Sequence, residues 1–183
     1  MACRKMAVAY NTYLSLTNNL ILNNESVIGG EILGYSWGAD AITTIILTNN
    51  IIAGNRAKYG SGIFSCSGKT GPDITQPEGK ISWELTNNTI TGNIASEGDG
   101  IHLHSGSDYG DGGKITFSSK NDIIWGNISP NNGPQVNVIV DPGKPGAVTA
   151  DISYTDVGPI TIGRTGTYSL SNTLDDAFVC RSC

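Results

Sequence analysis

The chain has 183 residues, enough for one domain with a substantial core, and about five units of roughly 34 residues would fill it. Its 11 lysines and arginines against 16 aspartates and glutamates give a net charge of −5, which argues against nucleic acid as a partner. No apolar run reaches the ~20 residues that cross a bilayer, and the basic N-terminus lacks the apolar stretch of a signal peptide. The chain is therefore predicted to contain neither a membrane span nor a signal peptide.

A segment that recurs four times predicts a solenoid. Each copy contains Asn-Asn or Asn-Asp, then a short stretch centred on isoleucine, then a final asparagine. Successive copies are 31, 38 and 34 residues apart, a period typical of stacked supersecondary units. The four copies are Leu16–Asn24, Leu47–Asn55, Leu85–Asn93 and Ser119–Asn127.

After each copy the chain shows a glycine or proline turn, a strand and then a second strand. The first of these strands begins at an aliphatic residue, namely Ile32, Ile63, Ile101 or Val136. The second is rich in β-branched or aromatic residues and covers 41–47, 80–85, 114–119 or 147–154. Three short strands and three turns per repeat predict an all-β fold, a parallel β-helix in which identical residues stack from coil to coil. The repeated isoleucines and Trp83 are expected in the core, and the repeated asparagines in side-chain ladders.

One outer face of this solenoid holds the candidate site. If Ile101 and Leu103 point inward, His102 and His104 point outward, because strand side chains alternate. Stacking extends this stripe to Phe64 and Cys66, to Leu33 and Tyr35, and to Asn137 and Ile139. Of the three tryptophans, only Trp37, in a loop-like Gly-Tyr-Ser-Trp-Gly segment, is left open as a residue that stacks on a sugar ring.

Two long loops, Ser67–Gly79 and Ser105–Gly113, leave the same strand, and loops of this length often serve function. Three aspartates lie nearby in the sequence: Asp99, Asp108 and Asp111. The residues leave three interpretations open: a solvated strand with turn-forming aspartates, a glycan-contacting surface, or a metal or catalytic site.

The sequences N-N-T-I-T-G-N at 87–93 and G-D-G-I-H-L at 98–103 resemble the right-handed parallel β-helix repeats of the pectate-lyase-like superfamily. The resemblance covers 16–154, and 121–127 followed by 152–158 look like the last coils of bacterial secreted or cell-surface β-helix proteins. It implies an extracellular location and an active groove on the outer face of a parallel sheet, where the stripe lies. It also implies that a lyase would show calcium-binding aspartates with a basic residue, and a hydrolase paired aspartates. The chain matches neither set.

The sequence therefore predicts one domain over 1–183, a right-handed parallel β-helix of four to five coils. Residues 1–15 are expected to form a partial first coil and 159–183 a C-terminal cap or tail. Open solenoid ends leave two alternatives, a fragment of a longer protein or self-association as a homo-oligomer.

For function, the residues favour a non-catalytic module that is structural or carbohydrate-binding, with a polysaccharide or cell-surface glycan as partner. The alternative is a polysaccharide lyase, hydrolase or epimerase acting at the same face. Neither a cofactor nor a metal-ligand set is predicted, although calcium stays open, and Cys3, Cys66, Cys180 and Cys183 fit neither zinc nor redox chemistry. The candidate catalytic residues are His102, His104, Asp99 and Asp111, and the candidate ligand-binding residues are Tyr35, Phe64, His102, His104 and Asp108.

Overall fold

The computed structural model describes residues 11–26, 31–38, 40–68, 78–97, 100–106, 112–129, 134–140, 146–158 and 160–163. These residues form only strands, turns and short connections, so the predicted all-β class is confirmed for them. The strands are β1 (Thr12–Thr17), β2 (Leu20–Leu22), β3 (Ile32–Trp37), β4 (Ile42–Thr48), β5 (Ile51–Ala53), β6 (Arg56–Tyr59), β7 (Ile63–Gly68), β8 (Lys80–Thr86), β9 (Thr89–Thr91), β10 (Ile94–Glu97), β11 (Ile101–Ser105), β12 (Lys114–Lys120), β13 (Ile123–Trp125), β14 (Val136–Val140), β15 (Ala147–Ser153), β16 (Asp156–Val157) and β17 (Ile160–Gly163).

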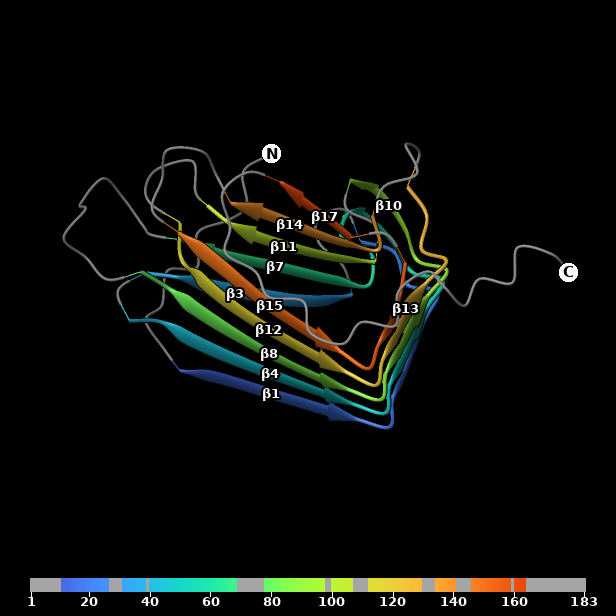
Figure 1. Ribbon diagram of the computed structural model, residues 1–183. Helices are drawn as coiled ribbons and strands as arrows, with labels where there is room; N and C mark the ends of the chain where they lie inside the picture. The colour runs from blue at the N-terminus through green and yellow to red at the C-terminus, as the bar shows by residue number, and fades with distance from the viewer. Residues whose placement is uncertain are drawn as a thin grey trace, which may run out of the picture.

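The strands stack into parallel sheets, one strand of each sheet per coil. Sheet A has the order β1-β4-β8-β12-β15, sheet B β2-β5-β9-β13-β16, and sheet D β3-β7-β11-β14-β17. A small sheet C pairs β6 with β10. In Figure 1 the strands of sheet A run to the right, sheet B forms the right-hand side, and the strands of sheet D run back to the left. This is the predicted parallel β-helix, with five strands stacked in each of sheets A, B and D.

Left-handed backbone positions make the corner between sheets A and B. Asn18, Asn49, Asn87 and Asn121 each follow a strand of sheet A and have φ between 55° and 59°. Asparagine is one of the few residues with a side chain that tolerates this region, because its short amide bonds locally. The recurring Asn-Asn pair in the sequence therefore has two parts: an exposed turn residue, followed by a residue that faces inward and belongs to a ladder.

Two ladders of side-chain amides run along the corners. In the first, the amide nitrogen of Asn50 donates to Asn88 Oδ1 over 3.0 Å and to the Leu16 carbonyl over 2.9 Å. In the second, Asn93 repeats the pattern with Asn127 Oδ1 at 2.8 Å and the Ile52 carbonyl at 2.9 Å. The predicted ladders are thus confirmed, and they satisfy buried polar atoms that would otherwise be costly. The first ladder consists of Asn19, Asn50, Asn88, Asp122 and Thr155, and the second of Asn24, Asn55, Asn93, Asn127 and Gln135.

The core fills the space enclosed by sheets A, B and D. The isoleucine columns form as expected, with Ile52 pairing with Ile90 and Ile90 with Ile124, all fully buried. Trp83 is also buried, as predicted, and its indole nitrogen donates to Ser65 Oγ over 2.9 Å. The ring reaches across the core to β3, where a Cβ on Gly34 would collide with it. A large residue on one sheet is therefore matched by small ones on the other.

Three features differ from the sequence prediction or add to it. No strand was predicted for Arg56–Tyr59 and Ile94–Glu97, but these segments form sheet C, a fourth side of the coil. Trp37 lies in strand β3 rather than in a loop. The strand Ile160–Gly163 pairs with β14, although it falls inside the segment expected as a cap or tail, most of which lies outside the described residues.

Candidate functional site

The outer surface of sheet D carries the predicted stripe in the predicted register. Two columns of residues run across its strands, and we call their outward-facing side chains, together with Trp37, the outer D face. One column pairs Leu33 with Phe64, Phe64 with His102 and His102 with Asn137. The other pairs Tyr35 with Cys66, Cys66 with His104 and His104 with Ile139. The alternation of inward and outward residues was therefore sufficient to locate this face.

An aromatic pair occupies the β3 end of the outer D face. Tyr35 and Trp37 lie two residues apart on one strand, so both point to the same side. Their rings stack with centroids 5.3 Å apart and planes inclined by 15°. Both side chains are half-buried, and the neighbouring Leu33 is 48% exposed. This end of the face is apolar and open to solvent.

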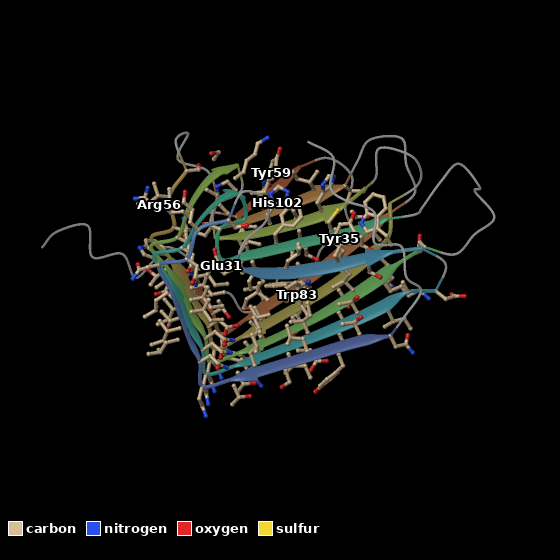
Figure 2. All side chains as sticks on the ribbon, turned by 180° about the vertical axis from the view of Figure 1, so that it is seen from behind. Glu31, Tyr35, Arg56, Tyr59, Trp83 and His102 are labelled. Carbon is tan, nitrogen blue, oxygen red and sulfur yellow. The ribbon has the colours of Figure 1, made fainter. Side chains whose placement is uncertain are left out.

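A second aromatic cluster surrounds His102. Phe64 stacks on the imidazole at 5.3 Å with an angle of 23°, and His104 meets it edge-on at 6.1 Å. Tyr59, from β6 of sheet C, approaches the same ring at 6.2 Å and 63°. Figure 2 shows Tyr59 and His102 together on the outer side of sheet D, while Trp83 lies between the sheets. His102 points outward as predicted, but these rings cover it, and only 4% of it is exposed.

Burial determines the electrostatics of His102. Desolvation, followed by the charge of His104, lowers the pKa of His102 to about 4, so its imidazole is neutral at pH 7. Its Nδ1 atom is buried without a hydrogen-bond partner, and so is Nε1 of Trp37 on the same face. A buried polar atom without a partner costs roughly 1–3 kcal/mol. The outer D face therefore carries two polar atoms that a ligand could satisfy.

A basic notch adjoins this cluster on sheet C. A cavity of about 450 Å³ is lined by Arg56, Lys58, Ser26 and Ser96, with the carboxylate of Glu25 among them. The Lys58 ammonium lies 4.8 Å from the centre of the Tyr59 ring. Tyr59 thus stands between the notch and the outer D face, in contact with residues of both.

The other predicted site residues have different outcomes. Tyr35, Phe64, His102 and His104 share one face, whereas Asp99, Asp108 and Asp111 lie outside the described residues. Within the described part of the chain, no three His, Cys, Asp or Glu side chains are placed to hold a metal ion. Cys66 is buried in β7, and the other three cysteines lie outside the described ranges.

Sequence reasoning missed Tyr59 as a site residue. Its strand is short and charged, Arg-Ala-Lys-Tyr, and it directly precedes a glycine turn, so no strand was predicted there. Gly60 is the signal that could have found it: its φ is 45°, and a Cβ there would lie 2.7 Å from His102 Cβ. That close approach places the preceding residue, Tyr59, over the next coil.

Comparisons with known proteins add no family to this description. None of the described residues belongs to a helix long and apolar enough to cross a membrane. No protein-family model matches the chain, and neither curated proteins nor solved structures show a significant match to it.

Proposed function

We propose that this β-helix is a non-catalytic, carbohydrate-binding module of an extracellular or cell-surface protein, and that it binds glycans on the outer D face. The observation that carries the proposal is the stacked pair of Tyr35 and Trp37, 5.3 Å apart on a solvent-facing strand. Flat aromatic faces with a polar edge suit a sugar ring, which has an apolar C–H face and a rim of hydroxyls.

The surroundings of the pair support the proposal. The unpartnered Trp37 Nε1 is a hydrogen-bond donor beside an apolar platform, the combination that small-molecule sites use for affinity and orientation. Parallel strands also repeat the surface from coil to coil, so an extended polymer could follow the columns across sheet D. The resemblance to pectate-lyase-like repeats supports the same face and the extracellular location.

The enzymatic alternative has no specific observation in its favour. Its carboxylates would have to come from Asp99, Asp108 and Asp111, which lie outside the described residues. The buried His102, with its pKa lowered to about 4, is a poor base for chemistry that needs access to substrate. The binding function is therefore the better supported of the two.

Affinity electrophoresis tests the proposal. Gels containing neutral or acidic polysaccharides should retard the wild type in at least one case, and Tyr35→Ala or Trp37→Ala should lose most of that retardation. Tyr13→Ala is the matched control, because Tyr13 is an exposed strand tyrosine on sheet A, 67% accessible and away from the outer D face.

Two results would count against the proposal. One is an unretarded wild type across the whole panel; the other is retardation that Tyr35→Ala and Trp37→Ala leave intact. Size-exclusion chromatography of the same glycans, with and without calcium, tests the enzymatic alternative, since shortening that Asp111→Ala abolishes would establish a depolymerising enzyme.

A further inference from the structure

His102 is a polar residue that the fold places at an outward position and then covers. The alternation of side chains along β11 puts it on the outer D face, in register with Phe64 and Asn137, yet only 4% of it is exposed. Its Nδ1 has no hydrogen-bond partner. A structural residue buried in this way would be expected to be bonded, as the ladder amides are. His102 therefore needs an explanation that core packing does not supply.

The cover over His102 comes from the least extensive sheet. Tyr59 ends β6, which pairs with β10 at three positions only, whereas sheets A, B and D have five strands each. Its ring contacts His102 and Phe64 on one side and the Lys58 ammonium on the other. Elements with few paired neighbours open at lower free energy than central strands. The Tyr59 ring is thus the part of this cluster that is easiest to displace.

We propose that Tyr59 is a movable cover over a hydrogen-bonding subsite of the outer D face, that Nδ1 of His102 is the recognising atom, and that a sugar hydroxyl occupies the subsite when the cover is displaced. This inference rests on the proposed glycan-binding function and extends it to a second position, on the other side of Phe64 from the Tyr35–Trp37 pair.

The chemistry of the subsite selects a neutral hydroxyl. A neutral imidazole presents either an N–H donor or a lone-pair acceptor at Nδ1, and a hydroxyl complements both, because it donates and accepts. A carboxylate could only accept, and an ammonium could only donate. Among the described residues, the charged or titratable groups near this ring are His104, Tyr59 and, beyond the Tyr59 ring, Lys58. Phe64 and Tyr59 complete the subsite with apolar walls.

The cover is tested first without ligand. In ¹⁵N-histidine NMR of the full chain, Tyr59→Ala should raise the pKa of His102 from about 4 toward the ordinary 6.5, because the ring is then hydrated. Tyr13→Ala, which removes an exposed tyrosine elsewhere, should leave it unchanged. An unchanged pKa in Tyr59→Ala would overturn the proposal, since Tyr59 would not be what buries His102.

The subsite is tested with maltohexaose and cellohexaose as neutral probes and hexagalacturonate as an acidic one. If the cover is closed about nine-tenths of the time, Tyr59→Ala should bind a neutral probe about tenfold more tightly than wild type. The probe should also shift the Nδ1 resonance of His102. Adding His102→Phe, which keeps a stacking ring without nitrogen, should remove the gain.

The outcomes separate this inference from the proposed function. Weaker binding by Tyr59→Ala would mean that Tyr59 itself contacts the glycan and would overturn the cover. If the wild type binds glycan and Tyr35→Ala does not, while the His102 Nδ1 resonance stays fixed in both the wild type and Tyr59→Ala, the subsite is overturned and the proposed function stands. Absence of binding by every probe to both proteins, together with no retardation by polysaccharides, would overturn both.

Discussion

The two corners that border sheet B and the outer D face are built by the same stacking, but they treat polar atoms in opposite ways. At these corners, the side-chain amide of a buried ladder residue such as Asn93 takes part in four hydrogen bonds. Among the described residues, the buried side-chain polar atoms that lack a partner are Glu31 Oε1, Trp37 Nε1 and His102 Nδ1. Each belongs to a strand of sheet D or to the residue directly before one.

This contrast supports the proposal that the corners stabilise the fold and that sheet D provides the binding surface. Saturated hydrogen bonding at the corner maintains the register of the coils, since a slip of one residue would break a whole ladder. Unsatisfied polar atoms on sheet D reduce stability and provide binding potential, as is common at functional sites. The following predictions test whether the two regions differ in this way.

Breaking a ladder should have the largest effect. Asn93→Ala removes four hydrogen bonds and leaves the Ile52 carbonyl and Asn127 Oδ1 without that donor, so the free energy of unfolding should fall by on the order of 4 kcal/mol. Urea denaturation, monitored by circular dichroism, measures this loss in the free energy of unfolding. Asn49→Gly is the control, because Asn49 is an exposed left-handed turn residue and glycine adopts that backbone freely. Equal losses in the two variants would contradict a special role of the ladder.

The buried histidine should make the protein sensitive to acid. Because the folded pKa of His102, about 4, lies below its ordinary value of 6.5, the unfolded chain binds the proton first as the pH falls. Stability should therefore drop between pH 6.5 and 4, by about 3 kcal/mol from this group, and then level off. His102→Phe should abolish that part of the fall and gain up to about 1 kcal/mol at pH 7. Parallel pH profiles for the two proteins would show that His102 is not the cause.

The first ladder contains one carboxylate, Asp122, and replacing it should change the free energy of unfolding less than the two changes above. Burial raises the pKa of Asp122, and hydrogen bonds from Ser119 and Asn88 oppose this in part. A carboxyl of raised pKa contributes most stability below its unfolded pKa and loses that contribution as the pH rises through its folded pKa. Asp122→Asn should thus stabilise the protein at pH 7, by about 1 kcal/mol if the new amide donates to the Leu85 carbonyl, as register predicts.

The gain in Asp122→Asn should shrink below pH 4, where the wild-type carboxyl is protonated and can itself donate. Denaturation at pH 7 and pH 3.5 separates the two contributions. A gain that is the same at both values would mean that packing, rather than ionisation, limits this position.

Truncating the aromatic pair should have the smallest effect on folding. Tyr35→Ala removes a half-buried ring from a solvent-facing strand, so the free energy of unfolding should change by less than about 1 kcal/mol, while glycan retardation is lost. Thermal unfolding and affinity electrophoresis of one preparation measure both quantities. A large loss of stability would place Tyr35 in the framework and weaken the contrast between the two regions.

Much of the fold is predictable because identical residues stack. The columns Ile52–Ile90–Ile124 and Ile63–Ile101–Val136 follow from spacing alone, and the register in the structure matches them. The amide ladders follow for the same reason, since an asparagine repeated at one corner must meet its neighbours. The side of sheet D on which His102 and His104 lie was likewise fixed by alternation.

The rest depends on contacts between different sheets, which a repeat does not encode. Alternation gives the side to which His102 points but not that Tyr59, from sheet C, covers it. The strand Arg56–Tyr59 has only four residues, so its alternation of charged and less polar residues is too short to predict a sheet. Trp83 reaches Ser65 across the core only because Gly34 has no side chain in its way. This match of a large and a small residue joins different sheets, so stacking within one sheet does not predict it.

The ladders also determine where the chain can change its length. In the first four coils the two ladder positions are always five residues apart, as in Asn50 and Asn55, because both must keep their partners. The connection from sheet D back to sheet A is free of this constraint. The first residue of β4 comes 10 residues after the first residue of β3, whereas the first residue of β8 comes 17 residues after that of β7. Insertions and grafted peptides should therefore be accepted at this connection, so that its sequence and length can vary while the ladder corners on the opposite side stay unchanged.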